Sequence, residues 1–146
     1  MTDAAPSDSS ALDSDSGIDR QRPAIRVMMM PKDTNAMGTI FGGIILSHID
    51  QAGAVEAHKV VHGRIVTVAL REVEFHQPVF VGDLVSYYAE VTRVGKTSIT
   101  VHVTVESERR IRTRERVIVT EADIVYVHVD DHNQPVPIDV HSPPDD

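Results

Sequence analysis

Asp50 is the side chain in this sequence that most needs a chemical explanation. Residues 42–57 have the pattern of a helix, and at helical spacing Asp50 falls on a stripe of apolar residues: Leu46, Ala54, Ala57 and Val61. Removing a lone carboxylate from water is costly, so such a group is usually paired, neutralised or used in chemistry. Asp50 is therefore the first candidate for a catalytic group, acting as a general base on water or as a nucleophile.

Two glycines, Gly42 and Gly43, stand at the expected start of this helix. Glycines expose main-chain N–H groups, and the helix dipole favours developing negative charge at that end. Asp50 lies seven residues beyond Gly43, about two turns along the same helix. A carbonyl held by the Gly43 N–H could thus lie near the carboxylate, although a tight glycine turn without a ligand explains the pair equally well. Asn35, in the loop just ahead, gains interest only from these neighbours, because Asn is common in turns.

Other polar groups fit known chemistry less well. His58 and His62 have the i,i+4 spacing of a metal pair, but no glutamate follows His58 and no third ligand is evident, so we expect no metal site. Residues 95–98, Gly-Lys-Thr-Ser, resemble the end of a phosphate-binding loop, yet Glu90 stands where that loop requires glycine. A nucleotide triphosphatase is rejected, and Lys96 remains a candidate contact for a ligand phosphate. We expect His48, His58 and His62 to face solvent. On the strands, His76 and His102 are expected to lie at the surface or to be hydrogen-bonded.

The basic run over residues 109–116 is interleaved with glutamates and has no aromatic neighbours for stacking on bases. A solvated, charged connection is therefore expected there, with contact to a phosphorylated small ligand left open. We expect no nucleic-acid partner.

One helix and a set of strands must position these groups. We expect a first strand over residues 24–30 ended by Pro31, then a helix over about 42–61 with Gly63 as its C-cap. Strands follow over 65–79, with a bulge near 71–72, and over 84–94. The turn 95–97 leads into a cleanly alternating strand with Ile99, Val101, Val103 and Val105 on one face, and a last strand covers 116–129. This order predicts an α+β fold in which strands in hairpin order form an antiparallel sheet on a single helix. Because one helix covers little of such a sheet, we expect at least a dimer.

The net charge of the chain lies in its two ends and not in the segment expected to form the helix and the strands. The chain has 146 residues, which fits one domain, and a formal net charge of −8. Five aspartates lie in residues 1–19 and three in residues 139–146, so residues 20–138 are formally neutral and the ends carry the whole net charge. We expect a domain over 21–138 between disordered tails, 1–20 and 139–146. The absence of cysteine excludes disulfides and a cysteine nucleophile. With no visible secretory signal and no apolar stretch long enough to span a membrane, we expect a cytoplasmic protein.

Several separated motifs agree in order and spacing with those of one family. They are MPKDTNAMGTIFGG at 30–43 followed by Asp50, HGRIVT at 62–67, FHQPVFVGD at 75–83, and EA at 121–122. Over residues 22–138 the sequence resembles the hotdog-fold acyl-CoA thioesterases, specifically the YciA-like branch. The resemblance implies an antiparallel sheet wrapped around one central helix, and hydrolysis of acyl-CoA to a free acid and CoA. It also implies dimers with one continuous sheet, of which three often build a hexamer.

The resemblance also implies roles for individual residues. Asp50 would be the catalytic carboxylate, Asn35 would come from the partner subunit, and the Gly43 N–H would polarise the thioester carbonyl. CoA, the leaving part of the substrate, would lie along the subunit boundary, and no further cofactor is required. Its expected contacts are Gly42, Arg64, Val66, Thr67, Lys96 and Thr97.

Two positions depart from the family pattern. Relatives often carry Asn or Gly where this chain has Met37, and Asp or Asn where it has Thr39, which could alter acyl preference or loop packing.

Two alternative functions stay open on the same fold. A non-catalytic acyl-CoA sensor would be expected to carry a DNA-binding helical segment, and residues 1–20 are too short and polar for one. A dehydratase or hydratase would need a histidine beside the acid, and Asp50 has no obvious histidine partner.

Overall fold

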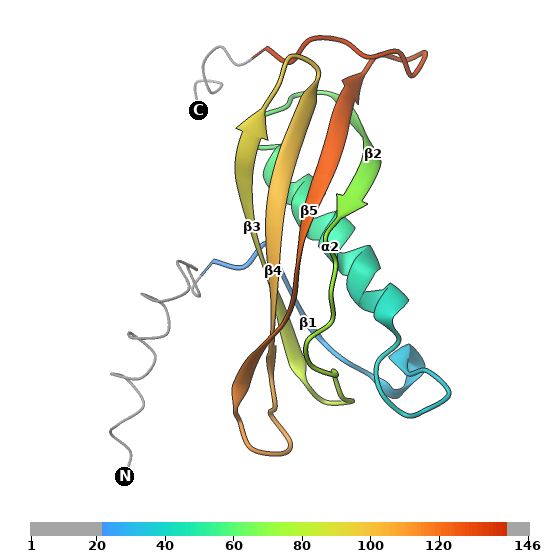
Figure 1. The fold of residues 1–146 in the computed structure, drawn as a ribbon, viewed down its shortest axis with the longest axis vertical. Helices are drawn as coiled ribbons and strands as arrows, with labels where there is room; N and C mark the ends of the chain where they lie inside the picture. The colour runs from blue at the N-terminus through green and yellow to red at the C-terminus, as the bar shows by residue number, and fades with distance from the viewer. Residues whose placement is uncertain (1–21, 140–146) are drawn as a thin grey trace.

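The computed structural model describes residues 22–139; the expected disordered tails lie outside the described residues, apart from Asp139. Figure 1 shows a long curved sheet with one α-helix packed across it. In chain order the elements are β1 (Ile25–Met28), the 3₁₀ turn η1 (Pro31–Asp33), α2 (Gly42–Ala57), β2 (Arg64–Arg71), β3 (Leu84–Val94), β4 (Ser98–Glu108) and β5 (Arg116–Val129). The α+β class and the sheet wrapped around a central helix are confirmed.

The strand order in the sheet is β1-β3-β4-β5-β2, and every pairing is antiparallel. The expected hairpin order is correct for β3, β4 and β5 but wrong for β2, which pairs with β5 instead of β3. The periodicity of one strand says nothing about its neighbour, and the long connection 72–83 lets the chain cross from one edge of the sheet towards the other. Part of that connection follows β5, where the His76 N–H donates to the carbonyl of Val119.

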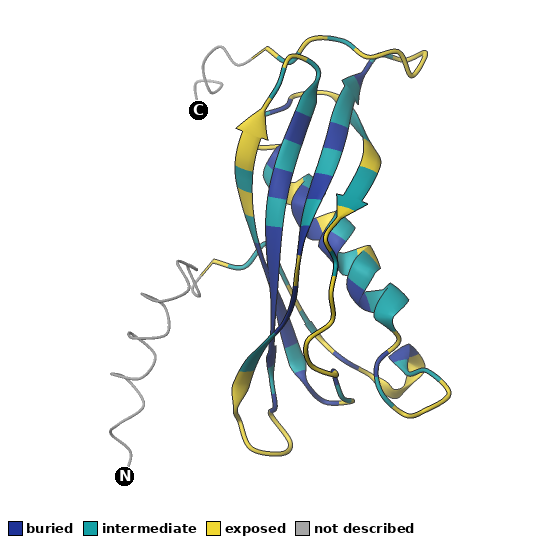
Figure 2. Cartoon of the chain, viewed as in Figure 1, coloured by how far each residue is buried: buried dark blue, intermediate teal, exposed yellow. Residues whose placement is uncertain are grey.

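The hydrophobic core lies between α2 and the inner face of the sheet. The alternation expected in β4 is confirmed for its inward-facing residues, all of which are fully buried: Ile99, Val101, Val103 and Val105. Figure 2 shows buried and half-buried positions alternating over the first part of β4, followed by a continuous buried stretch. On the helix, Ala52 and Gly53 let the sheet approach closely. Gly53 lies so near Tyr126 of β5 that a Cβ there would collide with the tyrosine hydroxyl.

Several expected bounds differ from the structure: β1 is shorter than the strand expected over 24–30, and the strand expected over 65–79 ends at Arg71. The helix ends at Ala57 with His58 as its C-cap; Gly63 lies beyond it, at a φ of +143°, and leads into β2. The register shift in β2 falls between Thr67 and Ala69, so the bulge is at Val68 and not near 71–72. Glu72 instead ends the strand with a positive φ. Among residues 22–139, no helix is long and apolar enough to cross a membrane.

Candidate active site

Asp50 lies beside the buried stripe of α2 and not on it. The buried residues of the helix are Ile45, Ile49, Ala52, Gly53 and Ala57. Asp50 is half-buried at the border of this stripe, as are Leu46 and Ala54. The expected stripe is therefore correct at Ala57 and Val61, which are buried. It was wrong by one position over its first part, because the two isoleucines decide which face turns inward. The carboxylate thus avoids the cost of full burial and can reach a ligand.

Two neighbouring strands hold Asp50 from the sheet side. The Thr67 hydroxyl of β2 donates to Asp50 Oδ1 at 2.8 Å. The Tyr126 hydroxyl of β5 donates to the main-chain oxygen of Asp50 at 2.6 Å. Thr67 and Tyr126 are direct partners in the β2–β5 register, and the bulge at Val68 follows Thr67. Bulges often redirect a side chain near an active site, and this one adjoins the residue that contacts the candidate carboxylate.

The hydrogen bonding of the Asp50 carboxylate is incomplete. Among the described residues, Thr67 donates to Oδ1 only; the Tyr126 hydroxyl lies close enough to interact with the carboxylate, but its hydrogen bond goes to the main-chain oxygen. An ionised carboxylate can accept about four hydrogen bonds. Oδ2 is therefore available to a water molecule or a substrate. Thr67 was expected to contact CoA; the structure places it against the carboxylate.

The start of α2 offers two main-chain donors. Phe41 is the N-cap, and its carbonyl accepts the Ile44 N–H at 3.0 Å. The N–H groups of Gly42 and Gly43 precede the first helical hydrogen bond and have no acceptor within the described part of the chain. The Phe41 ring lies against Gly43 so closely that a Cβ at this position would collide with it. The helix start can therefore donate to a carbonyl oxygen that develops negative charge.

The Asn35 amide is engaged in its own loop. Its Oδ1 accepts the N–H groups of Met37 at 2.8 Å and Thr39 at 3.2 Å. Its Nδ2 donates to the Thr39 hydroxyl at 2.9 Å. These contacts leave one Nδ2 hydrogen unused, and none of them reaches Asp50, so one protomer does not bring Asn35 and Asp50 together. Thr39, where the sequence departs from the family pattern, has a loop-packing role.

The expected CoA contacts do not converge within one protomer. Arg64 begins β2 opposite Val129 of β5, and the turn holding Lys96 and Thr97 joins β3 to β4 near the same end of the sheet. Gly42 is the first residue of α2, and Figure 1 shows the start of this helix far from the β3–β4 turn. A helix of 16 residues is about 24 Å long, so Gly42 lies well away from Arg64 and Lys96. Val66 shares β2 with Thr67 but points to the opposite face of the sheet.

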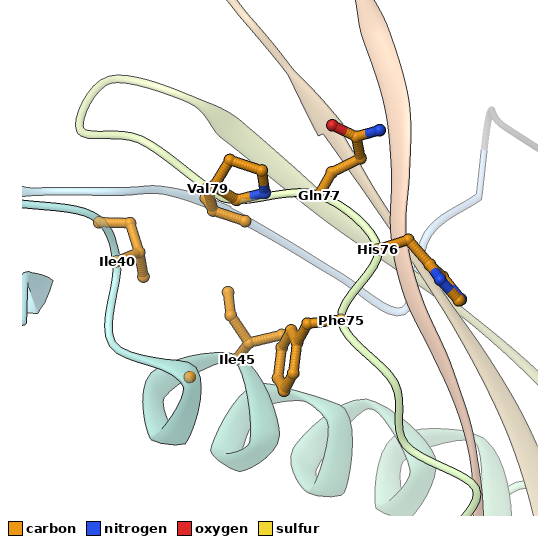
Figure 3. A pocket seen from close by; sticks show the side chains of 8 residues that line it. Ile40, Ile45, Phe75, His76, Gln77 and Val79 are labelled. Carbon is orange, nitrogen blue, oxygen red and sulfur yellow. The ribbon is translucent and has the colours of Figure 1, made fainter.

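A hollow of about 270 Å³ adjoins Gly42 between the helix start and the segment 75–79. Figure 3 shows the side chains of Ile40, Ile45, Phe75 and Val79 around it, with those of His76 and Gln77 directed away. Sequence reasoning missed this hollow because residues 65–79 were treated as one strand. The family motif at 75–83 was the signal that could have pointed to it.

Among residues 22–139, no histidine is hydrogen-bonded to the Asp50 carboxylate. His58 and His62 are exposed, as expected, but the expectation for His48 was wrong: its ring is half-buried, 5.6 Å from the Tyr87 ring. On the outer face of the sheet, His102 contacts Asp123 through Nδ1 at 2.8 Å and Glu121 through Nε2 at 3.1 Å. Burial lowers the pKa of His102, but the hydrogen bonds to these carboxylates outweigh it and raise that pKa above its usual range. Within residues 22–139, no group of three or more metal-ligating side chains is arranged to hold a metal ion.

Comparisons with known proteins identify the family. The family model for the thioesterase superfamily matches residues 37–113. The acyl-CoA thioester hydrolase YciA of Salmonella typhimurium is 41% identical over 118 residues, which are 80% of this chain and 89% of that protein. The structure of HI0827, a hexameric broad-specificity acyl-CoA thioesterase, matches with a TM-score of 0.79 at 37% identity and covers 84% of this chain and 90% of that one. An acyl-CoA hydrolase from Staphylococcus aureus, in complex with butyryl-CoA and CoA, matches with a TM-score of 0.71 at 28% identity, covering 84% and 74%.

The chain belongs to the thioesterase superfamily. Within it, the hotdog fold and the likeness to YciA and HI0827 over most of the chain make it an acyl-CoA thioester hydrolase of the YciA-like branch. The expected family, fold and activity are confirmed. The alternatives of a sensor and a dehydratase have no counterpart among these three relatives, all of which are hydrolases.

Proposed function

We propose that Asp50, Asn35 and the Gly43 N–H form the hydrolytic site for acyl-CoA thioesters. The observation that carries this proposal is the partly unoccupied carboxylate of Asp50 on the same helix as two unpaired N–H groups. Seven residues of helix separate Gly43 from Asp50, a rise of about 10 Å. A carbonyl bound at the helix start and one water molecule can bridge that distance, which favours a general base over direct attack by the carboxylate.

In this mechanism Asp50 takes a proton from water while the water oxygen bonds to the thioester carbon. The carbonyl oxygen becomes an oxyanion held by the Gly43 N–H; such a donor contributes about 3 kcal/mol in other enzymes. The intermediate then collapses, the carbon–sulfur bond breaks, and protonated Asp50 returns its proton to the CoA thiolate. The products are a carboxylic acid and CoA. Attack by Asp50 itself would instead give an anhydride. If water then opens that anhydride at the Asp50 carboxyl carbon, single-turnover hydrolysis in ¹⁸O-water gives an unlabelled product acid and leaves the label on Asp50, whereas the general-base route puts one ¹⁸O into each product acid.

The site is completed across a subunit boundary in this proposal. The support is that Asn35 is held in its own loop, away from Asp50 of the same chain, and that HI0827 is hexameric. The active form would be a homodimer with one continuous sheet, assembled as a trimer of dimers. CoA would follow the subunit boundary, with Arg64 and Lys96 as phosphate contacts, and the acyl group would enter the apolar hollow beside Gly42.

A free-thiol assay on the purified full chain, with acyl-CoAs of increasing chain length, tests the activity. We expect CoA release for several members of the series. Binding without release would support a sensor instead, and loss of water from a 3-hydroxyacyl-CoA without thiol release would support a dehydratase.

Subunit mixing tests the shared site. Asp50→Ala and Asn35→Ala should each be nearly inactive, but their mixed oligomers should recover activity in about one quarter of the sites if the two groups come from different chains. Mixtures of each variant with itself are the control. Two variants that stay inactive after verified exchange of subunits would place both groups on one chain.

A further inference from the structure

Tyr126 contacts the main chain of the residue that carries the proposed catalytic carboxylate. We propose that Tyr126 is a positioning residue that fixes the turn of α2 bearing Asp50, and that Gly53 is the glycine that makes room for it. The inference rests on the proposed role of Asp50. It assigns Tyr126 no contact with the substrate.

The tether acts on the backbone. The Tyr126 hydroxyl donates to the Asp50 main-chain oxygen at 2.6 Å, whereas Thr67 of the paired strand donates to the side chain. Because Thr67 and Tyr126 are opposite each other in the sheet, one pair of residues determines both where the Asp50 backbone lies and how its carboxylate is turned. The Asp50 oxygen already lies within the helical hydrogen-bond ladder, so the tyrosine supplies a second bond that helix formation itself does not require.

Gly53 supports this interpretation from the other side of the contact. A Cβ at position 53 would collide first with the Tyr126 hydroxyl and would also press on Ile124. Glycine in the interior of a helix is less stable than alanine. Its presence at a fully covered position is explained by the space that the hydroxyl occupies.

Tyr87 shows that a buried tyrosine beneath this helix need not have that role. Both tyrosines have no exposed surface, but the Tyr87 hydroxyl faces His48 at 3.5 Å, the limit of a hydrogen bond. Tyr87 thus contacts a side chain of the helix and, within residues 22–139, makes no hydrogen bond to Asp50. Burial, followed by the negative charge of Asp50, raises the pKa of Tyr126 well above its usual range, so its hydroxyl remains a donor while the enzyme works.

The first test compares Tyr126→Phe with Tyr87→Phe in the full oligomer. We expect Tyr126→Phe to lower kcat about tenfold with KM unchanged, because small displacements of a reacting group reduce rate more than binding. Tyr87→Phe should keep wild-type kcat. Equal losses of kcat in the two variants, or no loss in Tyr126→Phe, would overturn the proposal.

A second background separates positioning from general loosening of the core. In Asp50→Asn, which lacks the group to be positioned, adding Tyr126→Phe should cause no further loss of residual turnover, measured with enzyme in excess. A further tenfold loss there would show that Tyr126 acts independently of Asp50. A wild-type enzyme that releases no CoA would be a failure of the proposed function and not of this inference.

Gly53 gives a measurement that does not depend on residual activity in Asp50→Asn. Gly53→Ala should lower kcat by displacing the tyrosine hydroxyl, and the same change in Tyr126→Phe should cost clearly less, because the colliding oxygen is gone. An equal cost of Gly53→Ala in the two backgrounds, in both kcat and melting temperature, would contradict the proposed contact.

Discussion

Asp50 and Asp83 are two aspartates with opposite surroundings. Asp83 is 1% exposed. One of its carboxylate oxygens, Oδ2, accepts the Phe80 N–H at 3.0 Å, the Ser107 hydroxyl at 2.9 Å and the Arg109 guanidinium. Asp50 is half-buried and receives one side-chain hydrogen bond, from Thr67. The buried carboxylate held by three donors stabilises the fold, and the half-buried carboxylate held by one donor is the one available for chemistry.

The surroundings of Asp83 join two segments distant in sequence. Arg109 begins the connection between β4 and β5, and it lies over the Phe80 ring, 4.8 Å from the ring centroid. Arg112 lies 4.7 Å from the same centroid. The charged connection therefore docks on the turn before β3, so the expectation that it is solvated was wrong for Arg109, which is buried.

Asp50→Ala should have the largest effect on activity. We expect kcat to fall between about 10² and 10⁴-fold, the usual contribution of a positioned acid or base, while the melting temperature stays within about 2 °C of wild type because the side chain is half-buried and weakly paired. Glu56→Ala on the same helix, which removes a surface ion pair with Lys59, is the matched control and should keep full activity. Full activity in Asp50→Ala would refute the mechanism.

Asp83→Asn should show the reverse pattern. It keeps the shape of the side chain but leaves the Arg109 charge buried without its partner, which costs about 3 kcal/mol or more. Urea or thermal unfolding would measure this loss, and kcat per folded enzyme should change little. In Asp83→Asn combined with Arg109→Met, the unpaired charge is gone, so the double variant should be more stable than the sum of the two single losses predicts. Simple additivity would mean that the pair is not coupled.

These two aspartates also show what a sequence can reveal. The bounds of β3 and β5 were predicted correctly because alternation and turn residues are local signals. Asp50 was noticed because its surroundings on the helix are local as well. The burial of Asp83 was missed, since Ser107 and Arg109 lie 24 and 26 residues away in the sequence. Tyr126, 76 residues from Asp50, was missed for the same reason. The edge position of β2 likewise depends on a pairing that periodicity does not encode.

Thr67→Val tests the single donor to Asp50. Valine has nearly the same shape, so the fold should be retained, but the carboxylate loses the bond that orients it. We expect kcat to fall about 10- to 100-fold, in line with the contribution of a hydrogen bond to a charged group. Thr92→Val, which removes a threonine hydroxyl bonded to the Thr100 carbonyl away from the site, should have wild-type kcat. Identical kcat values for Thr67→Val and wild type would mean that substrate or water orients Asp50 without help from β2.

Replacing His102 should have a smaller effect than replacing Asp50, Asp83 or Thr67. Its ion pairs are more exposed than that of Asp83, but unlike Asp50 its carboxylate partners face an imidazole that can carry charge. Its carboxylate partners, Asp123 and Glu121, are more than one third exposed, and Glu72, Glu74 and His76 line the same hollow. Because the pKa of His102 is raised in the folded state, its contribution to stability is present below its unfolded pKa of about 6.5 and is lost as pH rises through the folded pKa.

Replacing His102 should therefore lower the stability of the fold below neutral pH and leave it unchanged well above neutral pH. Relative to wild type, His102→Gln should lower the melting temperature at about pH 6 by about 1–3 °C, since solvent screens surface pairs, and should have almost no effect near pH 9. His62→Gln, at an exposed histidine, controls for losing an imidazole. A deficit that is equal at both pH values would mean that His102 packs against the sheet as a neutral ring. The charge of His102 beside Asp123 and Glu121 would then contribute nothing to stability.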